Sequence, residues 1–321
     1  MNNSIKIVGI DISSDRLDAY SHAEGHHQFK NNDKGFAGLV KTYGSAAHYV
    51  MESSGCYHVL LALYLSSQGI AVSVENGLTI KRFIQMRLTK VKTDKADAKL
   101  ICEYGSYQEL RLWKAPDAVQ QAGSSMFSLL QFYEKLRVQI QNKLHRENAL
   151  GLPSKMVVNL LKNQLKTLSS EVKNVEKELE KLMKTLYKDE LKLLRSIPGI
   201  GVKTSLFIVM MTDGMRNFET SGQLCSYAGL TPVIRESGKS VRSRPRISKM
   251  GSGVLRKLLY MCSMNAVKYN KACKELYERI TAQGKSGKVA LVAVCCKLLK
   301  QSFGILKSRT PYSENFSLKF A

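Results

Sequence analysis

The sequence predicts a mixed α/β domain, then a long helical hairpin, then a mainly helical C-terminal part. Short β-branched runs alternate with helix-like segments near the N-terminus, which is typical of an α/β sheet domain. A long repeat of apolar residues in steps of four and three follows, and this spacing is typical of a coiled coil. Apolar helices separated by glycine-rich turns come last. We expect the three parts to span residues 1–123, 124–190 and 191–321.

The first part should hold five strands and three helices. Residues 5–12 read Ile-Lys-Ile-Val-Gly-Ile-Asp-Ile, a β-branched run typical of a buried strand. Further strands are expected at 16–21, 26–30, 48–52 and 70–74, and helices at 33–43, 56–68 and 92–107. Strands joined by tight turns run antiparallel and strands joined by helices run parallel. The order therefore predicts a sheet of mixed strand direction.

The second part carries the apolar repeat. Leu129, Tyr133, Leu136 and Ile140 begin it, and Gly151 and Pro153 interrupt it. It then continues through Leu161, Leu165, Leu168, Val172, Val175, Leu179, Leu182 and Leu186. We expect a helical hairpin bent at the glycine and proline. Its apolar seam should pair either with the other helix of the hairpin or with a second chain.

The third part opens with Ile-Pro-Gly-Ile-Gly at 197–201, directly before an expected helix at 203–211. Such a turn either aims backbone N–H groups at a phosphate or is an ordinary tight turn, and the sequence leaves both open. Further helices are expected within 218–232 and at 251–269 and 285–307.

Composition narrows the class of partner. Lys and Arg number 49 against 26 Asp and Glu, which gives a formal net charge of +23. This excess points to a polyanion, first nucleic acid and second an anionic membrane. No apolar run approaches the roughly 18 residues that span a bilayer, and the N-terminus lacks the pattern of a signal peptide. We therefore expect a cytoplasmic protein without a membrane. The seven cysteines lack zinc-ligand spacing, so we expect reduced, buried thiols.

A basic stretch between 235 and 257 is the strongest candidate for contact with nucleic acid. Its cations are Arg235, Lys239, Arg242, Arg244, Arg246, Lys249, Arg256 and Lys257, and its one acid is Glu236. Because the stretch is rich in Gly and Ser and the whole chain is basic, we expect phosphate contacts. The alternative is a solvated charged face.

Four carboxylates form the candidate metal site. Asp11 ends the first expected strand and Glu52 ends a later one, while Asp94 and Asp97 share a face of the helix expected at 92–107. Acids that converge repel one another unless cations join them. Two Mg²⁺ ions about 4 Å apart would relieve the repulsion and act on a phosphodiester, and Mn²⁺ accepts the same oxygen ligands. The alternative is that each acid is a helix cap or a surface charge.

These motifs resemble the DEDD transposase family of insertion sequences, which also contains the Piv-type DNA invertases. The N-terminal segments that carry the resemblance are Val-Gly-Ile-Asp-Ile at 8–12, Glu-Ser-Ser-Gly-Cys-Tyr at 52–57 and Lys-Thr-Asp-Lys-Ala-Asp-Ala at 92–98. The C-terminal segments are 197–201, Phe218, Tyr-Ala-Gly-Leu-Thr-Pro at 227–232, Arg-Ile-Ser-Lys-Met-Gly at 246–251 and Leu-Arg at 255–256. The chain departs from the family pattern at Asn76-Gly77 and on both sides of Gly251.

The resemblance implies an N-terminal RNase H-like fold of the RuvC type, with family acids at Asp11, Glu52, Asp94 and Asp97. It also implies a nucleophilic serine at Ser248 that attacks double-stranded DNA in site-specific recombination. Some members are guided by a structured non-coding RNA. The resemblance further implies a higher oligomer whose active sites combine domains from different subunits. For this chain we expect a dimer or tetramer that assembles through the coiled coil. The expected setting is the prokaryotic cytoplasm, at the nucleoid.

The assignment of Ser248 leaves alternatives. Ser243 and Ser252 are close in sequence, and Ser248 could instead cap a helix. All six histidines lie in the first half of the chain, which disfavours a Ser-His-Asp hydrolase. The rival functions are a RuvC-type junction-resolving nuclease that uses water, a Piv-like invertase, and a nucleic-acid-binding scaffold without catalysis.

Overall fold

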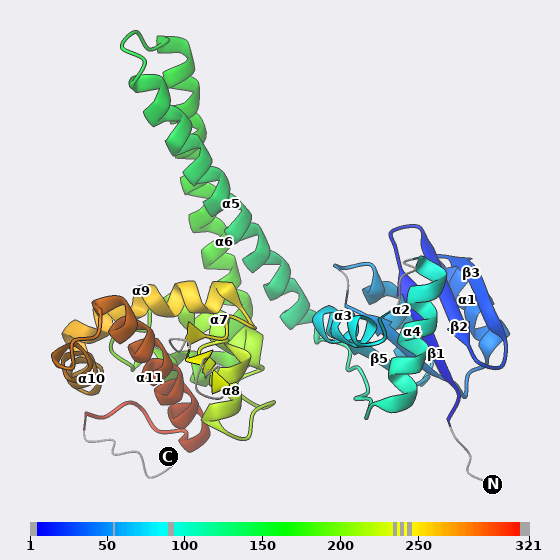
Figure 1. The fold of residues 1–321 in the computed structure, drawn as a ribbon. Helices are drawn as coiled ribbons and strands as arrows, with labels where there is room; N and C mark the ends of the chain where they lie inside the picture. The colour runs from blue at the N-terminus through cyan, green and yellow to red at the C-terminus, as the bar shows by residue number, and fades with distance from the viewer. Residues whose placement is uncertain are drawn as a thin grey trace. The chain divides into compact units, whose positions relative to one another are not determined.

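The computed structural model describes residues 5–53, 55–88, 93–233, 236–237, 241–242 and 246–314. The chain divides into two compact units, Met1–Pro116 and Asp117–Ala321, coloured blue to cyan and green to red in Figure 1. The helical hairpin and the C-terminal helices share the second unit, so the expected division of that region into two domains stays a prediction.

The first unit is built on a five-stranded sheet. Its order is β3-β2-β1-β4-β5, and the strands are β1 (Ile7–Ile12), β2 (Arg16–Ser21), β3 (Gly25–Lys30), β4 (His48–Glu52) and β5 (Val72–Glu75). β1 is antiparallel to β2 and parallel to β4, and β4 is parallel to β5. The predicted mixed sheet is confirmed.

Helices cover both faces of this sheet. α1 (Asp33–Tyr43) and α2 (His58–Ser67) pack their buried residues on the face that carries Val8 and Ile10. α3 (Gly77–Met86) and α4 (Asp94–Tyr107) pack on the face that carries Val50. The sequence pattern had not predicted α3. The expected start of α4 at Lys92 lies outside the described residues, and the helix begins at Asp94.

Gly9 in β1 allows α4 to lie directly on the sheet. A Cβ atom at this position would overlap the backbone N of Cys102 and the carbonyl oxygen of Ala98, both in α4. Because neighbouring residues of a strand alternate between faces, Asp11 lies on the same face as Gly9. The glycine therefore brings α4, with its first-turn acids, close to the end of β1.

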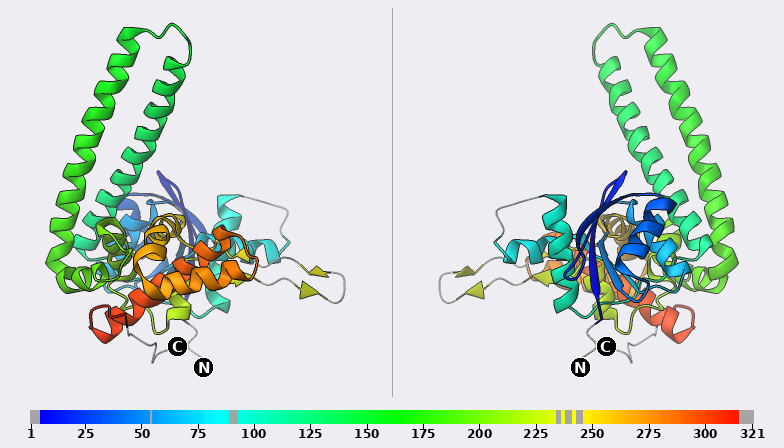
Figure 2. Two further views of the ribbon diagram at one scale, coloured as in Figure 1. Left: turned by 90° about the vertical axis from the view of Figure 1, so that its left-hand side faces the viewer. Right: turned by 90° about the vertical axis from the view of Figure 1, so that its right-hand side faces the viewer.

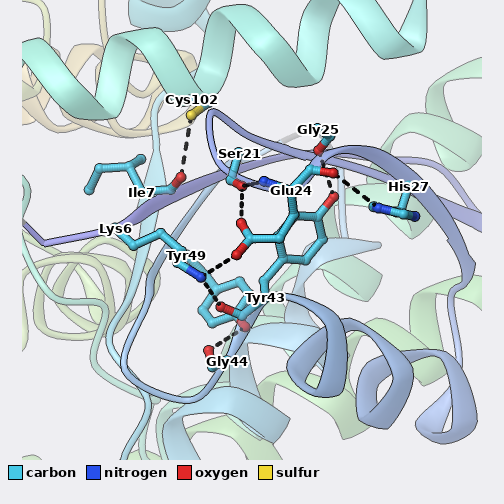
Figure 3. A network of polar contacts seen from close by, with 10 residues as sticks. All are labelled: Lys6, Ile7, Ser21, Glu24, Gly25, His27, Tyr43, Gly44, Tyr49 and Cys102. Carbon is cyan, nitrogen blue, oxygen red and sulfur yellow. Dashed lines mark hydrogen bonds and ion pairs between the residues drawn. The ribbon is translucent and has the colours of Figure 1, made fainter.

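A polar network secures the opposite end of β1 (Figure 3). The ammonium of Lys6 donates to Glu24 Oε1 at 2.5 Å and to the carbonyl of Tyr43 at 3.0 Å. The Tyr43 hydroxyl donates to the carbonyls of Ala19 and Gly25. The hydrogen bond from Lys6 is the main cause that lowers the pKa of Glu24. This network joins the start of β1, the β2–β3 turn and α1, so its polar side chains stabilise the fold.

The second unit begins with a long helical hairpin, α5 (Ala118–Asn148) and α6 (Lys155–Arg195). Figures 1 and 2 show the two helices side by side, with their connecting turn far from the other helices of the unit. The turn contains Gly151, whose φ of 78° is readily adopted by glycine. Coiled-coil packing along the hairpin stays a prediction.

The buried seam of α6 drifts away from the expected heptad. Val172 and Leu179 are buried as expected, but Leu186 is 42% exposed, and Met183 and Tyr187 are fully buried. A straight helix drifts by about 20° per heptad, and α6 also bends at Tyr187, where φ is −129° and ψ is 31°. The Tyr187 hydroxyl donates to Asp213 Oδ1 at 2.7 Å, which ties this bend to the loop after α7.

In the described part of the second unit, the hairpin is followed by five shorter helices: α7 (Val202–Thr212), α8 (Ser221–Tyr227), α9 (Gly253–Tyr269), α10 (Lys271–Ala282) and α11 (Gly287–Ser308). Among the same residues, two short ladders lie between α8 and α9. β6 (Pro232–Val233) pairs with β9 (Arg246–Ile247), and β7 (Glu236–Ser237) pairs with β8 (Val241–Arg242). The latter ladder extends away from α7–α11 in Figure 2. The sequence pattern had not predicted α10.

α11 is apolar and long enough to span a bilayer by composition alone, with a mean hydropathy of 1.7 over its most apolar 18-residue window, of which 44% is buried. The expectation that no segment approaches this length was therefore too strict. Ala290, Val294, Leu298 and Ile305 are nonetheless buried in the second unit, and the central helix of a folded core has the same composition.

All seven cysteines are free thiols. Five are buried, Cys296 is partly buried, and Cys56 is exposed, so the expectation of buried thiols was wrong for Cys56. This residue lies in the turn before α2.

Candidate functional site

Asp11 and Glu52 lie at the same edge of the sheet. β1 and β4 are adjacent and parallel, so their carboxyl ends meet at one edge, and each acid lies at or next to its strand's last residue. Both side chains are half-buried. The predicted position of these two residues at the ends of their strands is confirmed.

Gly77, the first residue of α3, leaves the space that Glu52 occupies. A Cβ atom at Gly77 would lie 2.5 Å from Glu52 Oε1. The preceding Asn76 caps α3, because its Oδ1 accepts from the backbone N of Leu78 at 2.8 Å. A carboxylate at a helix N-terminus is stabilised by the helix dipole. The Asn76-Gly77 pair, at which the chain departs from the family pattern, thus has a structural role beside the candidate acid.

Asp94 and Asp97 lie in the first turn of α4. Thr93 caps this helix, since its hydroxyl oxygen accepts from the backbone N of Ala96 at 3.2 Å. Asp94 is exposed and Asp97 is half-buried. Since α4 packs on β1 at Gly9, its first turn faces the edge where β1 ends.

The negative charges of the other three candidate acids act on Asp11. Its pKa is raised to about 6, first by burial and then by the negative charges of Asp97, Asp94 and Glu52. A backbone hydrogen bond from Ile12 opposes this rise. Each of the three predicted partners is close enough to act on Asp11, so the predicted convergence has electrostatic support.

The chemistry of these side chains fits a hard divalent cation. All four supply carboxylate oxygens, the ligands that Mg²⁺ and Mn²⁺ prefer, and the mutual repulsion at Asp11 is the kind that a cation relieves. Within the described part of the chain, no group of three or more His, Cys, Asp or Glu side chains is already arranged as a coordination shell. The identity of the four as metal ligands thus remains a proposal.

Two further acids flank the cluster and are held by neutral or basic donors. Asp18 is opposite Asp11 in the β1–β2 register; it is 6% exposed, and His26 Nε2 lies 2.8 Å from its Oδ1. Glu75 is opposite Glu52 in the β4–β5 register, and the Tyr104 hydroxyl donates to it at 3.2 Å. From spacing along the chain alone, these two acids could not be distinguished from the candidate metal ligands, because their partners are brought to them by the pairing of strands and by the packing of α4.

Ser248 lies in the second unit, directly after β9. It is half-buried, and its backbone N donates to the carbonyl of Thr231 at 2.9 Å. Ser252 instead caps α9, because its hydroxyl oxygen accepts from the backbone N of Leu255 at 3.2 Å. The capping role considered for Ser248 thus belongs to Ser252. Ser243 lies outside the described residues.

The structure describes only part of the basic stretch. Arg235, Lys239 and Arg244 lie outside the described residues, and of Arg242 only the backbone in β8 is described. Arg246, Lys249 and Lys257 are exposed, as phosphate contacts require. Arg256 is half-buried, and its Nη1 donates to the carbonyl of Ala228 at 2.9 Å.

The glycine turn before α7 packs tightly against α9. Gly199 has a φ of 107°, and a Cβ atom there would lie 2.8 Å from that of Ala266. Close packing therefore accounts for Gly199 without a ligand, and the phosphate-binding alternative stays a prediction.

Comparison with known proteins points to one family. A family model for the IS110-type DEDD transposases, described as Transposase, matches residues 8–146, and one described as Transposase IS116/IS110/IS902 family matches residues 191–278.

Full-length relatives agree with these matches. The Pilin gene-inverting protein of Moraxella bovis is 28% identical over 322 residues, which cover 96% of this chain and 97% of that protein. The corresponding protein of Moraxella lacunata is 27% identical with the same coverage. The transposase for insertion sequence element IS1111A of Coxiella burnetii is 24% identical and covers 79% of this chain and 76% of its own. Over most of its length the chain is therefore similar to the IS110-type DEDD transposases of insertion sequences.

Proposed function

We propose that this protein is a transposase that cuts and rejoins double-stranded DNA by using Ser248 as nucleophile and the carboxylates around Asp11 as a metal site. The observation that carries the proposal is the placement of Asp11 and Glu52 at one edge of the sheet, beside the first turn of α4. The pKa of Asp11, raised by burial and by the charges of Asp97, Asp94 and Glu52, agrees with this placement. Such a concentration of negative charge in a protein of net charge +23 needs a function. The strand order 3-2-1-4-5 supports an RNase H-like fold of the RuvC type for the first unit.

Asp11, Glu52, Asp94 and Asp97 would hold the divalent cation, Mg²⁺ or Mn²⁺, and four carboxylates offer enough oxygen ligands for a pair of such ions. When bound, the cation supplies positive charge to the phosphodiester oxygens. The carboxylates would hold that charge in position. Gly77 lets α3 lie close to Glu52, and Gly9 lets α4 lie close to the sheet.

The proposed step at Ser248 balances without an external energy source. The hydroxyl oxygen attacks phosphorus and loses its proton to solvent, and a serine–phosphate bond forms. The bond from phosphorus to one sugar oxygen breaks, and that oxygen takes up a proton. The number of phosphodiester bonds is unchanged, so attack by another DNA hydroxyl reseals the strand and releases the serine. The chain accordingly needs no ATP-binding loop, and its sequence contains no GxxxxGK[ST] motif.

The basic stretch supplies the DNA contacts in this proposal. Arg246, Lys249 and Lys257 expose their charges on the segment that carries Ser248, so phosphates bound there would lie near the serine. We further propose assembly of a dimer or tetramer through the hairpin, guidance by a structured RNA, and action at the nucleoid in the cytoplasm, as the family resemblance implies.

A trapping experiment tests the proposal. The full chain is mixed with Mg²⁺ and DNA that carries the ends of its element, quenched in denaturant and separated from free DNA. We expect the wild type to form a covalent adduct, and Ser248→Ala and Asp11→Asn to form none while both still bind DNA. The matched control Ser252→Ala should keep the adduct, because Ser252 only caps α9.

The rival functions predict different outcomes. If the protein is a nuclease that uses water, the Ser248→Ala variant should still cut DNA. If it is a non-catalytic scaffold, the Asp11→Asn and Glu52→Gln variants should keep every activity of the wild type. Either outcome would contradict the proposal.

DNA inversion is a second candidate for the reaction. Two relatives that cover 96% of this chain are named for inverting a pilin gene. A plasmid with a promoter between two inverted element ends distinguishes the reactions, because inversion reverses the promoter and transposition moves the element elsewhere.

A further inference from the structure

We propose that Arg256 is a positioning residue for Ser248, and that its guanidinium holds the turn behind the serine rather than a DNA phosphate. This inference rests on the proposed function, in which Ser248 is the nucleophile. It separates Arg256 from the exposed cations of the same basic stretch.

Arg256 is directed into the fold of the second unit. It lies in the first turn of α9 and is half-buried. Its Nη1 donates to the carbonyl of Ala228, the C-cap residue of α8, at 2.9 Å. The bond spans 28 residues of sequence, so this one side chain joins the end of α8 to the start of α9.

The segment that carries Ser248 lies along the same α8 turn. The backbone N of Ser248 donates to the carbonyl of Thr231 at 2.9 Å, and that of Lys249 donates to the carbonyl of Gly229 at 3.2 Å. These two bonds continue the pairing of β6 with β9. The position of the serine backbone is therefore defined by the chain just after Ala228.

Two glycines make this contact too close for any other side chain. Gly251 has a φ of 132°, and a Cβ atom there would overlap the carbonyl oxygen of Tyr227. Gly229 has a φ of 70°, and its Cβ would lie 2.6 Å from the carbonyl oxygen of Met250 and 2.7 Å from Arg256 Nη1. The guanidinium thus packs over Gly229, in the contact between the two turns.

This arrangement lets Arg256 act on Ser248 through the backbone. A planar guanidinium fixes a carbonyl in direction as well as distance, which the point charge of lysine does less well. Catalysis requires the nucleophile within about 0.5 Å of its productive position, and a misplacement of about 1 Å can cost about 100-fold in rate. Loosening of the α8 turn should therefore reduce the rate of attack more than DNA affinity.

The test compares Arg256→Gln and Arg256→Lys with Lys268→Gln in the full chain. Lys268 lies in the last turn of the same helix, is exposed, and loses the same charge on substitution. Two quantities are measured for each variant: the rate of adduct formation at saturating DNA that carries the element ends, and the dependence of DNA affinity on salt. Thermal unfolding of each variant checks that the second unit is folded.

We expect Arg256→Gln to form the adduct about 100-fold more slowly at saturating DNA, with the salt dependence of affinity unchanged. Arg256→Lys should recover part of this rate, because lysine can still donate one hydrogen bond, and Lys268→Gln should keep the full rate. An unchanged rate together with a smaller salt slope for Arg256→Gln would overturn the inference in favour of a phosphate contact. Should Arg256→Gln fail to fold, an Arg256→Lys protein that folds and keeps the wild-type rate would overturn it equally.

The inference and the proposed function fail in different ways. If Ser248→Ala keeps the adduct, the proposed function is wrong. If Ser248→Ala abolishes the adduct and the folded Arg256 variants keep their rate, only the positioning role is wrong.

Discussion

At the scale of single residues, His48 shows how burial sets a pH response. It is 8% exposed at the start of β4, and its Nε2 lies 2.8 Å from the hydroxyl oxygen of Ser73. Burial lowers its pKa from 6.5. The folded state therefore favours the neutral imidazole, while the unfolded chain binds a proton near the ordinary pKa.

We predict that this histidine contributes to acid sensitivity of the first unit. Stability should be fully present above about pH 6.5 and should fall as the pH decreases toward the lowered pKa, because the unfolded state then binds more protons. His48→Gln removes the titration and should flatten urea-denaturation stability between about pH 6.5 and 5. His22, which is exposed, is the matched control, and an equal flattening in His22→Gln would contradict the assignment.

Gly9 should be intolerant of any side chain. We predict that Gly9→Ala costs about 3 kcal/mol or more, because its Cβ would overlap backbone atoms of α4 that cannot move independently. Urea denaturation followed by circular dichroism measures this cost. Gly38→Ala is the control: its Cβ would lie 3.4 Å from Phe29 in ordinary contact, and alanine favours the helix by up to about 1 kcal/mol. Similar stabilities of the two variants would contradict the close packing.

The candidate acids could be predicted from sequence, whereas their supports could not. Asp11 and Glu52 each close a recognisable strand, and parallel neighbours end at one edge. Gly77 lies against Glu52, and Arg256 donates to the carbonyl of Ala228. Both contacts join segments that are distant in sequence. No local pattern distinguishes such a glycine from a turn residue, or such an arginine from a solvated cation.

At the scale of elements, close packing of α5 on α6 defines the base of the hairpin. A Cβ atom at Gly123 of α5 would lie 2.8 Å from the sulfur of Met183. Arg195 and Glu180 of α6 form an ion pair at 2.7 Å near the same end. Leu179 is 1% exposed and belongs to the core that includes Phe127.

Two leucines of the predicted seam should therefore differ in their contribution to stability. We predict that Leu179→Ala lowers the free energy of unfolding by about 2–5 kcal/mol, the usual cost of emptying a packed leucine site. Leu186→Ala should cost less than about 1 kcal/mol, because its side chain is already 42% exposed. Chemical denaturation of the full chain compares the two, and equal losses would show that the seam follows the heptad after all.

Helices with clear ends were predictable, and those that share an end were not. α1 and β4 have the predicted bounds, because Gly44 ends the helix and an apolar run defines the strand. α10 follows α9 after only Asn270, which ends one helix and caps the next. Without a loop between them, the chain offered no signal of a second helix. The bend of α6 at Tyr187 likewise had no local signal, because Tyr187 is hydrogen-bonded to Asp213 rather than to neighbouring residues.

At the scale of the whole molecule, the net charge of +23 governs binding to DNA. Each phosphate contact contributes about 0.9 to the slope of log affinity against log salt. We predict that Arg246→Gln and Lys249→Gln each reduce this slope by about 0.9, because both side chains are exposed beside Ser248. Filter binding over a salt series measures it, with the exposed hairpin residue Lys166 as control. A slope that changes only in Lys166→Gln would transfer the DNA contact to the hairpin.

The proposed recombination depends most on a covalent bond between DNA and one serine. The most direct measurement digests the denatured adduct with nuclease and protease and locates the remaining nucleotide by mass spectrometry. We predict a nucleotide phosphate on the peptide that contains Ser248, attached to that residue, and none on Ser252. A nucleotide attached to another residue, or DNA cut with no attached peptide, would contradict the account.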